Sequence, residues 1–189
     1  LATLSDGTTI VGPKAHKKKL SLLKRVNRKY ARTQKESKRR ERVRRRLTKL
    51  HFKIACVRKD SLHKLTTMLS KNHGTIGIED LNVIGMVKNR SLARAIGDMG
   101  FREFRYQLEY KCKWYGSSLV VHDRFFPSSK TCSSCGAMKE SLPLSERVFD
   151  CGCGLKIDRD LNAAINLDTN PTVRRVLDVE ASSATTLNY

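Results

Sequence analysis

The sequence predicts an α/β fold that includes a long basic helical hairpin and an inserted metal-binding ribbon. Short apolar runs alternate with longer stretches whose apolar residues recur at helical spacing. Residues 14–72 contain no Gly or Pro and carry most of the excess positive charge. Two close cysteine pairs follow in the last third of the chain. At 189 residues, the chain has roughly the length of one domain with an inserted ribbon.

The N-terminal residues predict a β-hairpin. Residues 1–4 and 8–11 are short runs rich in apolar and β-branched side chains, and Ser5-Asp6-Gly7 separates them. A short loop that ends in Asp-Gly favours a tight turn between two antiparallel strands.

Residues 14–72 predict two long helices. One series of residues spaced by three and four positions is Leu20, Leu23, Asn27, Tyr30 and Gln34. A second, cleaner series is Val43, Leu47, Leu50, Ile54, Val57, Ser61 and Leu65. Alternating steps of four and three are typical of a coiled-coil seam. Because each helix needs an apolar partner, we expect the chain to fold back near residues 33–38.

Strands and helices alternate in the rest of the chain. Residues 75–78 form an apolar run that ends in Glu79, which predicts a buried strand. Residues 91–115 have the spacing of a helix, residues 118–122 predict another strand, and residues 159–167 predict a second helix. Cys56 and Cys112 stand alone and are expected in the core. Residues 169–189 carry little pattern and are expected to form a flexible tail.

Positive charge is concentrated in the predicted hairpin. The net charge is +20, and residues 14–60 hold 21 Lys and Arg against three acidic residues. Such a field attracts polyphosphate and releases its counterions. A solvated helix face is the alternative, although like charges this dense along one helix repel each other. We therefore predict nucleic-acid contacts from Lys38, Arg39, Arg40, Arg42, Arg44, Arg45, Arg46 and Lys130.

Four cysteines predict a zinc ribbon over residues 127–157. Cys132 and Cys135 form a C-x2-C pair, and Cys151 and Cys153 form a C-x-C pair after a spacer of 15 residues. Zinc ribbons place two close pairs about 15–20 residues apart. Four thiolates make a closed tetrahedral site, so the zinc would stabilise the fold without taking part in catalysis. Two disulfides of a secreted domain are the alternative, for which we find no signal peptide.

Acidic residues at the ends of predicted elements are candidate magnesium ligands. Glu79 ends an apolar strand, and Asp160 lies at the start of a helix. Phosphodiester hydrolysis with two metal ions needs several carboxylates around cations about 3.5–4 Å apart. Magnesium prefers such oxygen ligands. Simpler explanations remain open, because Glu79 suits a surface position and Asp158 or Asp160 suits a helix N-cap.

Four motifs together resemble the TnpB proteins, the OrfB "transposases" of bacterial insertion sequences, which are related to compact type V CRISPR effectors. The motifs are TIGIEDLN at residues 75–82, WYG at 114–116, DRFFPSSKTCSSCG at 123–136 and DRDLNAAIN at 158–166. The resemblance implies a RuvC nuclease of RNase H-like fold, with a mixed sheet flanked by helices. It implies a core over residues 1–126 with the basic hairpin at about 14–72, a ribbon over 127–157, and a last motif and helix over 158–168.

The resemblance also implies an activity, which is RNA-guided cleavage of DNA with two catalytic magnesium ions. The partners would be a guide RNA from the transposon end and a target DNA. Among the catalytic acids, Glu79 matches the second and Asp160 the third, with Asp158 as the neighbouring alternative. The implied location is the cytoplasm of a bacterium or archaeon, in association with the nucleoid. No run of residues approaches the roughly 18 apolar residues of a membrane span.

The first catalytic acid and the N-terminal recognition half of the family are expected to precede Leu1. The chain is then expected to hold two of the three acids and to be inactive as a nuclease by itself. Two other functions stay open at this point. One is a non-catalytic, zinc-dependent nucleic-acid-binding fragment, and the other is an accessory transposase. The oligomeric state is not predicted.

Overall fold

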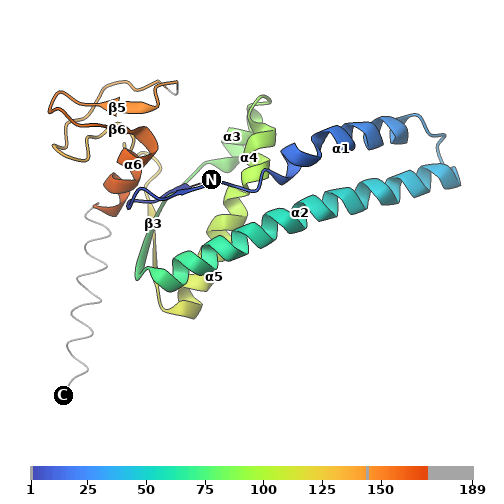
Figure 1. Ribbon diagram of the computed structural model, residues 1–189, viewed down its shortest axis with the longest axis horizontal. Coiled ribbons are helices and arrows are strands. Elements are labelled where there is room, and N and C mark those ends of the chain that lie inside the picture. Colours follow the sequence, from blue (N-terminus) through green and yellow to red (C-terminus); the bar gives the residue numbers. More distant parts are fainter. Residues whose placement is uncertain (1, 144, 170–189) are drawn as a thin grey trace, which may run out of the picture. The chain divides into compact units, whose positions relative to one another are not determined.

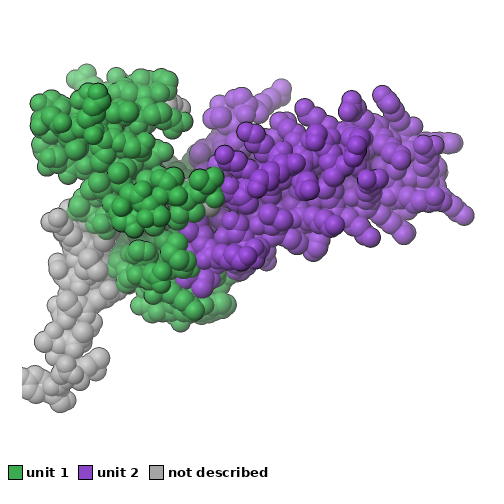
Figure 2. Space-filling view, in the orientation of Figure 1, with its two compact units in different colours: residues 1–11, 68–82, 108–189 green, residues 12–67, 83–107 purple. Residues whose placement is uncertain are grey.

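A computed structural model describes residues 2–143 and 145–169, which form two compact units. One unit contains residues 1–11, 68–82 and 108–189, and the other contains residues 12–67 and 83–107 (Figure 2). The predicted tail lies almost entirely in residues 170–189, outside the described part of the chain. The predicted boundaries of the nuclease core and of the ribbon stay predictions.

Two antiparallel helices dominate the unit of residues 12–67 and 83–107, as the sequence predicts (Figure 1). Helix α1 covers Ala15–Ala31, and helix α2 covers Lys38–Asn72. Ala15 and Leu23 of α1 pack against Leu50 and Ile54 of α2 in one buried cluster. Leu22 and Leu47 cover the edge of this cluster.

The seam between these helices is shorter than its sequence pattern. Val57 is 52% exposed, and Asn27 and Gln34 are also exposed. Val57 is exposed because helix α1, which covers the apolar face of α2, begins only at Ala15. Ala15 packs in the same cluster as Ile54, which comes before Val57 on α2. Val26, which the seam pattern omits, is buried.

The helix expected over residues 91–115 is two helices in the structure. Helix α4 covers Ala93–Met99, and helix α5 covers Phe101–Tyr115. Gly100 separates them with a φ of 73°, in the left-handed region that favours glycine at a helix C-terminus. A short helix α3, Val83–Lys88, precedes them and contacts α4. The Asp98 carboxylate of α4 accepts hydrogen bonds from the first amide groups of α1, at His16 and Lys17.

Three pairs of strands belong to the other unit. The predicted N-terminal hairpin is confirmed, with β1 (Ala2–Thr3) antiparallel to β2 (Thr9–Ile10). Strands β3 (Thr75–Glu79) and β4 (Ser118–His122) are parallel, and β5 (Val148–Asp150) and β6 (Lys156–Asp158) are antiparallel. Within residues 2–143 and 145–169, the strands form three two-stranded sheets rather than one continuous mixed sheet.

Helix α6 connects these pairs of strands. It covers Arg159–Asp168 and contacts β1, β3, β5 and β6. Of the two lone cysteines, Cys112 is buried as expected, whereas Cys56 is exposed on α2, so its prediction as a core residue was wrong. None of the described helices has both the length and the apolar character needed to cross a membrane.

Candidate functional site

The four predicted zinc ligands converge. The Sγ atoms of Cys132, Cys135, Cys151 and Cys153 all lie within 4.8 Å of one another. The distance from Cys132 Sγ to Cys153 Sγ is 3.7 Å, and so is the distance from Cys135 Sγ to Cys151 Sγ. A tetrahedron with Zn–S bonds of about 2.3 Å separates its sulfur atoms by about 3.8 Å. The cluster therefore fits a zinc ion, and its cysteines form no disulfide.

Local structure explains why the cysteines meet. Each pair sits in a tight turn that closes with a glycine of positive φ, which is 77° at Gly136 and 93° at Gly154. Both glycines donate their amide hydrogen to the carbonyl of the first cysteine of the pair. The fully buried Phe149 packs beside Cys132 and Leu142, which gives the ribbon a small core of its own.

The backbone of the first knuckle favours a thiolate at Cys132. The backbone amide of Cys135 donates to the Cys132 sulfur and lowers its pKa from 9.0 to about 6, although burial acts in the opposite direction. The deprotonated thiolate is the form that binds zinc.

Glu79, the first predicted magnesium ligand, lies at the end of β3. Its position pairs with His122 of the parallel strand β4. The Glu79 side chain is exposed, and its Oε1 accepts a hydrogen bond from the hydroxyl of Ser128. The next acid, Asp80, forms an ion pair with Arg124 at 2.6 Å. Glu79 forms no ion pair within the described residues, unlike its neighbour Asp80.

His122 is a buried neighbour of this end of the sheet. Its ring lies over Gly77, where an added Cβ would be only 2.9 Å from His122 Nε2. Burial lowers the pKa of His122 below its usual range, and the Glu79 carboxylate acts weakly in the opposite direction. Glycine at position 77 therefore provides the space for this imidazole.

Asp158 and Asp160 differ in their surroundings. Asp158 is the N-cap of α6, and its Oδ1 accepts hydrogen bonds from the amides of Asp160 at 2.9 Å and Leu161 at 3.1 Å. The Asp160 side chain is exposed in the first turn, and we find no hydrogen bond to its carboxylate in residues 2–143 and 145–169. This difference favours Asp160 as the ligand and assigns the capping role to Asp158.

The two proposed acids belong to elements that touch, because α6 packs against β3. The contact involves the far end of α6, since the Leu167 carbonyl oxygen lies near Gly77 of β3. Among the described residues, the cysteines form the one group of three or more potential metal ligands that converges.

Three polar residues near Glu79 were not singled out by the sequence reasoning. Ser128, Asn162 and Asn166 are buried, and their hydrogen bonds join the segment of residues 127–133 to α6. The available signal was the pair of asparagines four positions apart in DRDLNAAIN, because this spacing puts both amides on one helix face.

The basic hairpin presents its charge unevenly. Arg44 and Arg45 form ion pairs with Glu41, and the hydrogen bond from Arg44 is the main cause that lowers the Glu41 pKa to about 2. The Arg40 guanidinium donates to the carbonyl oxygens of Tyr30 and Thr33 and stacks on the Tyr30 ring at 4.1 Å. Arg40 therefore closes the turn between α1 and α2.

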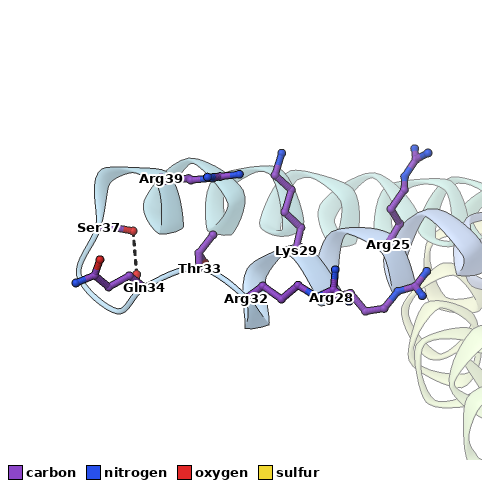
Figure 3. A pocket seen from close by; sticks show the side chains of 8 residues that line it. All are labelled: Arg25, Arg28, Lys29, Arg32, Thr33, Gln34, Ser37 and Arg39. Atoms are coloured by element: carbon purple, nitrogen blue, oxygen red, sulfur yellow. Dashed lines mark hydrogen bonds between the residues drawn. The ribbon is translucent and has the colours of Figure 1, made fainter.

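Two basic pockets lie along the hairpin. One, of about 660 Å³, is formed by both helices and their turn (Figure 3). Its lining residues are Arg25, Arg28, Lys29, Arg32, Thr33, Gln34, Ser37 and Arg39. The other, of about 460 Å³, is lined by Leu22, Arg42, Arg45, Arg46, Lys49, Leu50 and Lys53. Of the other predicted contacts, Lys130 donates instead to the Glu140 carbonyl within the ribbon, and Lys38 is exposed at the start of α2.

Comparison with known proteins identifies the family to which this chain is related. Residues 1–90 match the family model described as "Probable transposase" (OrfB_IS605), and residues 101–167 match the model "Cas12f1-like, TNB domain". A Streptomyces pristinaespiralis protein named "Putative RNA-guided DNA endonuclease" is 46% identical over 167 residues, which cover 88% of this chain and 42% of that protein. A "TnpB-like protein" of Acanthamoeba polyphaga mimivirus is 30% identical, over 69% of this chain and 26% of that protein. The chain belongs to the TnpB/OrfB family.

Solved structures agree on the fold of this TnpB/OrfB chain. A cryo-EM structure of a CRISPR-Cas12f ternary complex matches with a TM-score of 0.63 at 24% identity, over 82% of this chain and 32% of that one. A Cas12f1–sgRNA–target DNA complex matches with a TM-score of 0.55 at 23% identity, over 83% and 43% of the two chains. The chain thus has a mixed α/β fold similar to Cas12f1, and it spans less than half the length of the relatives described above.

Proposed function

We propose that this chain is the nuclease portion of an RNA-guided DNA endonuclease associated with an insertion sequence. The observation that carries the proposal is the match of residues 1–90 and 101–167 to the two family models, in a chain with Glu79 at the end of β3 and Asp160 in the first turn of α6. The names of the relatives and the guide RNA and target DNA in the Cas12f1 complex support RNA and DNA as partners.

Glu79 and Asp160 are the proposed magnesium ligands. Both side chains are exposed, and neither has an ion pair within residues 2–143 and 145–169. Carboxylate oxygens suit magnesium, which supplies charge stabilisation at a phosphate and acidifies a bound water. A site for two metal ions needs further carboxylates.

The other features have supporting roles in this proposal. Cys132, Cys135, Cys151 and Cys153 hold a structural zinc ion. The basic hairpin binds the phosphate backbone through the residues that line its two pockets, which contain Arg39, Arg42, Arg45 and Arg46 of the predicted contacts. Because Arg40 and Lys130 hydrogen-bond to backbone carbonyls, their part in nucleic-acid binding is expected to be small.

Magnesium-dependent cleavage of a guide-matched duplex by the complete protein tests the proposal. Glu79→Gln is expected to abolish cutting and to leave target binding nearly intact, because base pairing and backbone contacts rather than these acids carry the affinity. Robust cutting by Glu79→Gln would show that the active site lies elsewhere. Cutting that needs no guide RNA would favour a transposase-type activity, and binding without any cutting would favour a non-catalytic module.

A further inference from the structure

The segment between β4 and the first zinc ligand touches the proposed magnesium ligand Glu79. Ser128 lies four residues before Cys132 and is only 3% exposed. Its hydroxyl hydrogen points to Glu79 Oε1. This bond occupies one carboxylate oxygen of Glu79 and limits the rotation of the side chain, so that Oε2 is the oxygen left for a cation.

Two buried asparagines hold this segment on α6. The Asn166 amide donates to the carbonyl oxygens of Ser128 and Thr131, both at 2.7 Å. The Asn162 amide donates to the same Thr131 carbonyl at 2.7 Å, and its side-chain oxygen accepts from the Ser133 amide at 3.0 Å.

Asparagine is a poor choice for the buried face of a helix unless its polar atoms are needed. It has a low helix propensity, and a buried amide without partners costs free energy. Yet Asn162 is fully buried and Asn166 is 7% exposed. Each hydrogen-bonds to the backbone of residues 128–133 through its amide group. These side chains therefore fix where the segment lies against α6.

The hydrogen bonds form one path between the two proposed acids. It runs from Glu79 to Ser128, continues through the backbone of residues 128–133, and reaches α6 at Asn162 and Asn166. Asp160 is two positions before Asn162, on the same helix. The same segment contains Cys132 and so begins the zinc ribbon.

We propose that Ser128 is a positioning residue for Glu79, and that α6 holds Ser128 in place through Asn162 and Asn166. This proposal rests on the proposed nuclease function. The segment that leads into the ribbon then fixes the orientation of one proposed magnesium ligand. Removing a hydrogen-bond partner of a metal ligand typically costs about 10–100-fold in metal affinity or activity.

The magnesium dependence of cleavage by the complete, guide-loaded protein tests the positioning role. Ser128→Ala is expected to raise the magnesium concentration for half-maximal cleavage by about 10–100-fold, with unchanged zinc content and melting temperature. Binding of Mn²⁺ to the same protein without nucleic acid, followed by EPR, should weaken in parallel. The matched control is Ser129→Ala, because Ser129 is the adjacent serine and forms no hydrogen bond to Glu79.

A second variant separates the hydroxyl from simple packing. Ser128→Thr keeps the hydroxyl but adds a methyl group at a buried position. A positioning role predicts a magnesium dependence close to that of the parent for Thr and a weakened one for Ala. If Ser128 acts only through packing, Ser128→Thr should weaken the magnesium dependence more than Ser128→Ala does, because the added methyl group disturbs the buried site more than the loss of the hydroxyl. This comparison also decides the matter if Ser128→Ala loses its zinc or its fold.

Two outcomes overturn the proposal without touching the proposed function. One is a Ser128→Ala protein whose magnesium dependence and Mn²⁺ binding equal those of Ser129→Ala. The other is a Ser128→Thr protein that is weakened as much as Ser128→Ala is expected to be. Failure of the function itself would appear differently, as continued cutting by Glu79→Gln in the same assay.

Discussion

Asp158 and Asp160 are two positions apart, yet their carboxylates have different tasks in the structure. Both side chains are exposed, but the Asp158 carboxylate accepts two amide hydrogen bonds at the start of α6, whereas Asp160 lies in the first turn of the helix. Sequence spacing alone left both as candidates for the N-cap and for the metal ligand. The local geometry gives Asp158 the capping role, because its Oδ1 accepts the amide hydrogen bonds from Asp160 and Leu161.

Substitution of these two aspartates should therefore give opposite results. Asp160→Asn is expected to abolish cleavage by the complete protein and to leave its melting temperature unchanged. Asp158→Ala is expected to lower the free energy of unfolding by about 1 kcal/mol through loss of the N-cap, whereas Asp158→Asn keeps a capping oxygen and should be nearly neutral. Thermal unfolding and cleavage of a guide-matched duplex are the measurements. Loss of cutting in Asp158→Asn but not in Asp160→Asn would exchange the two assignments.

At the scale of elements, the ribbon depends on its four cysteines. Its apolar core is small, with Cys132, Leu142 and Phe149 buried, and structural zinc sites contribute directly to folding. We expect one zinc ion per chain in the parent protein and its loss in Cys135→Ser. Cys56→Ser is the matched control, because Cys56 is an exposed free cysteine outside the cluster. Equal zinc in Cys135→Ser and Cys56→Ser, measured by metal analysis, would refute the site.

Substitutions in the hairpin can test whether DNA binding depends on the basic residues of the pockets or on the total positive charge of the hairpin. Arg42 and Arg46 line one basic pocket, whereas Lys59 and Lys64 lie further along α2, outside both basic pockets. Each backbone phosphate neutralised on duplex DNA contributes about −0.9 to the slope of log K against log salt. The double change Arg42→Gln and Arg46→Gln should therefore weaken binding and reduce the magnitude of this slope by about 2.

The matched double change is Lys59→Gln and Lys64→Gln, which removes the same charge from the same helix. Its salt slope is expected to stay at the parent value. Equal slopes for the two double variants would mean that the hairpin acts through its net field alone. Fluorescence anisotropy of a labelled duplex over a series of salt concentrations makes the comparison.

The elements of this protein were predictable to different degrees. The helical hairpin, the turn at Asp6 and Gly7, the strands at 75–79 and 118–122 and the cysteine cluster follow from local signals, which are periodicity, turn residues and metal-ligand spacing. The parallel pairing of the two strands was not predicted. The break at Gly100 was missed because an isolated glycine inside a helical pattern is often tolerated. Burial at the ends of the seam was missed because it depends on where α1 begins.

The sequence predicts the candidate metal ligands of the site, but it does not predict the residues that position them. Glu79 and Asp160 stand out because Glu79 ends an apolar strand and Asp160 lies in the first turn of an amphipathic helix. The bond from Ser128 to Glu79 joins residues 49 positions apart in the sequence, and no periodicity reports such a contact. The spacing of Asn162 and Asn166 places them on one helix face, but it does not show that this face is buried, since asparagine is also common in turns.

At the scale of the whole molecule, we expect nucleic-acid binding and cleavage to depend on different parts of the chain. Residues 14–60 carry 21 of the 38 Lys and Arg, and the remaining residues are nearly neutral. Affinity for nucleic acid should therefore follow the hairpin, because counterion release is its main source. Cleavage should instead follow Glu79 and Asp160, whose two carboxylates are fewer than a pair of bridged metal ions requires.

The 189-residue chain should accordingly bind duplex DNA without cutting it. We expect salt-sensitive binding that is independent of base sequence, because backbone contacts carry no sequence information directly, and no magnesium-dependent cleavage product. The complete protein with its guide RNA should cut the matched duplex, since a site for two metal ions needs carboxylates besides Glu79 and Asp160. Both are compared at equal concentration in one cleavage assay, with Glu79→Gln in the complete protein as the inactive reference. Guide-independent cutting by the 189-residue chain at the rate of the complete protein would contradict this division, because Glu79 and Asp160 would then need no further acid.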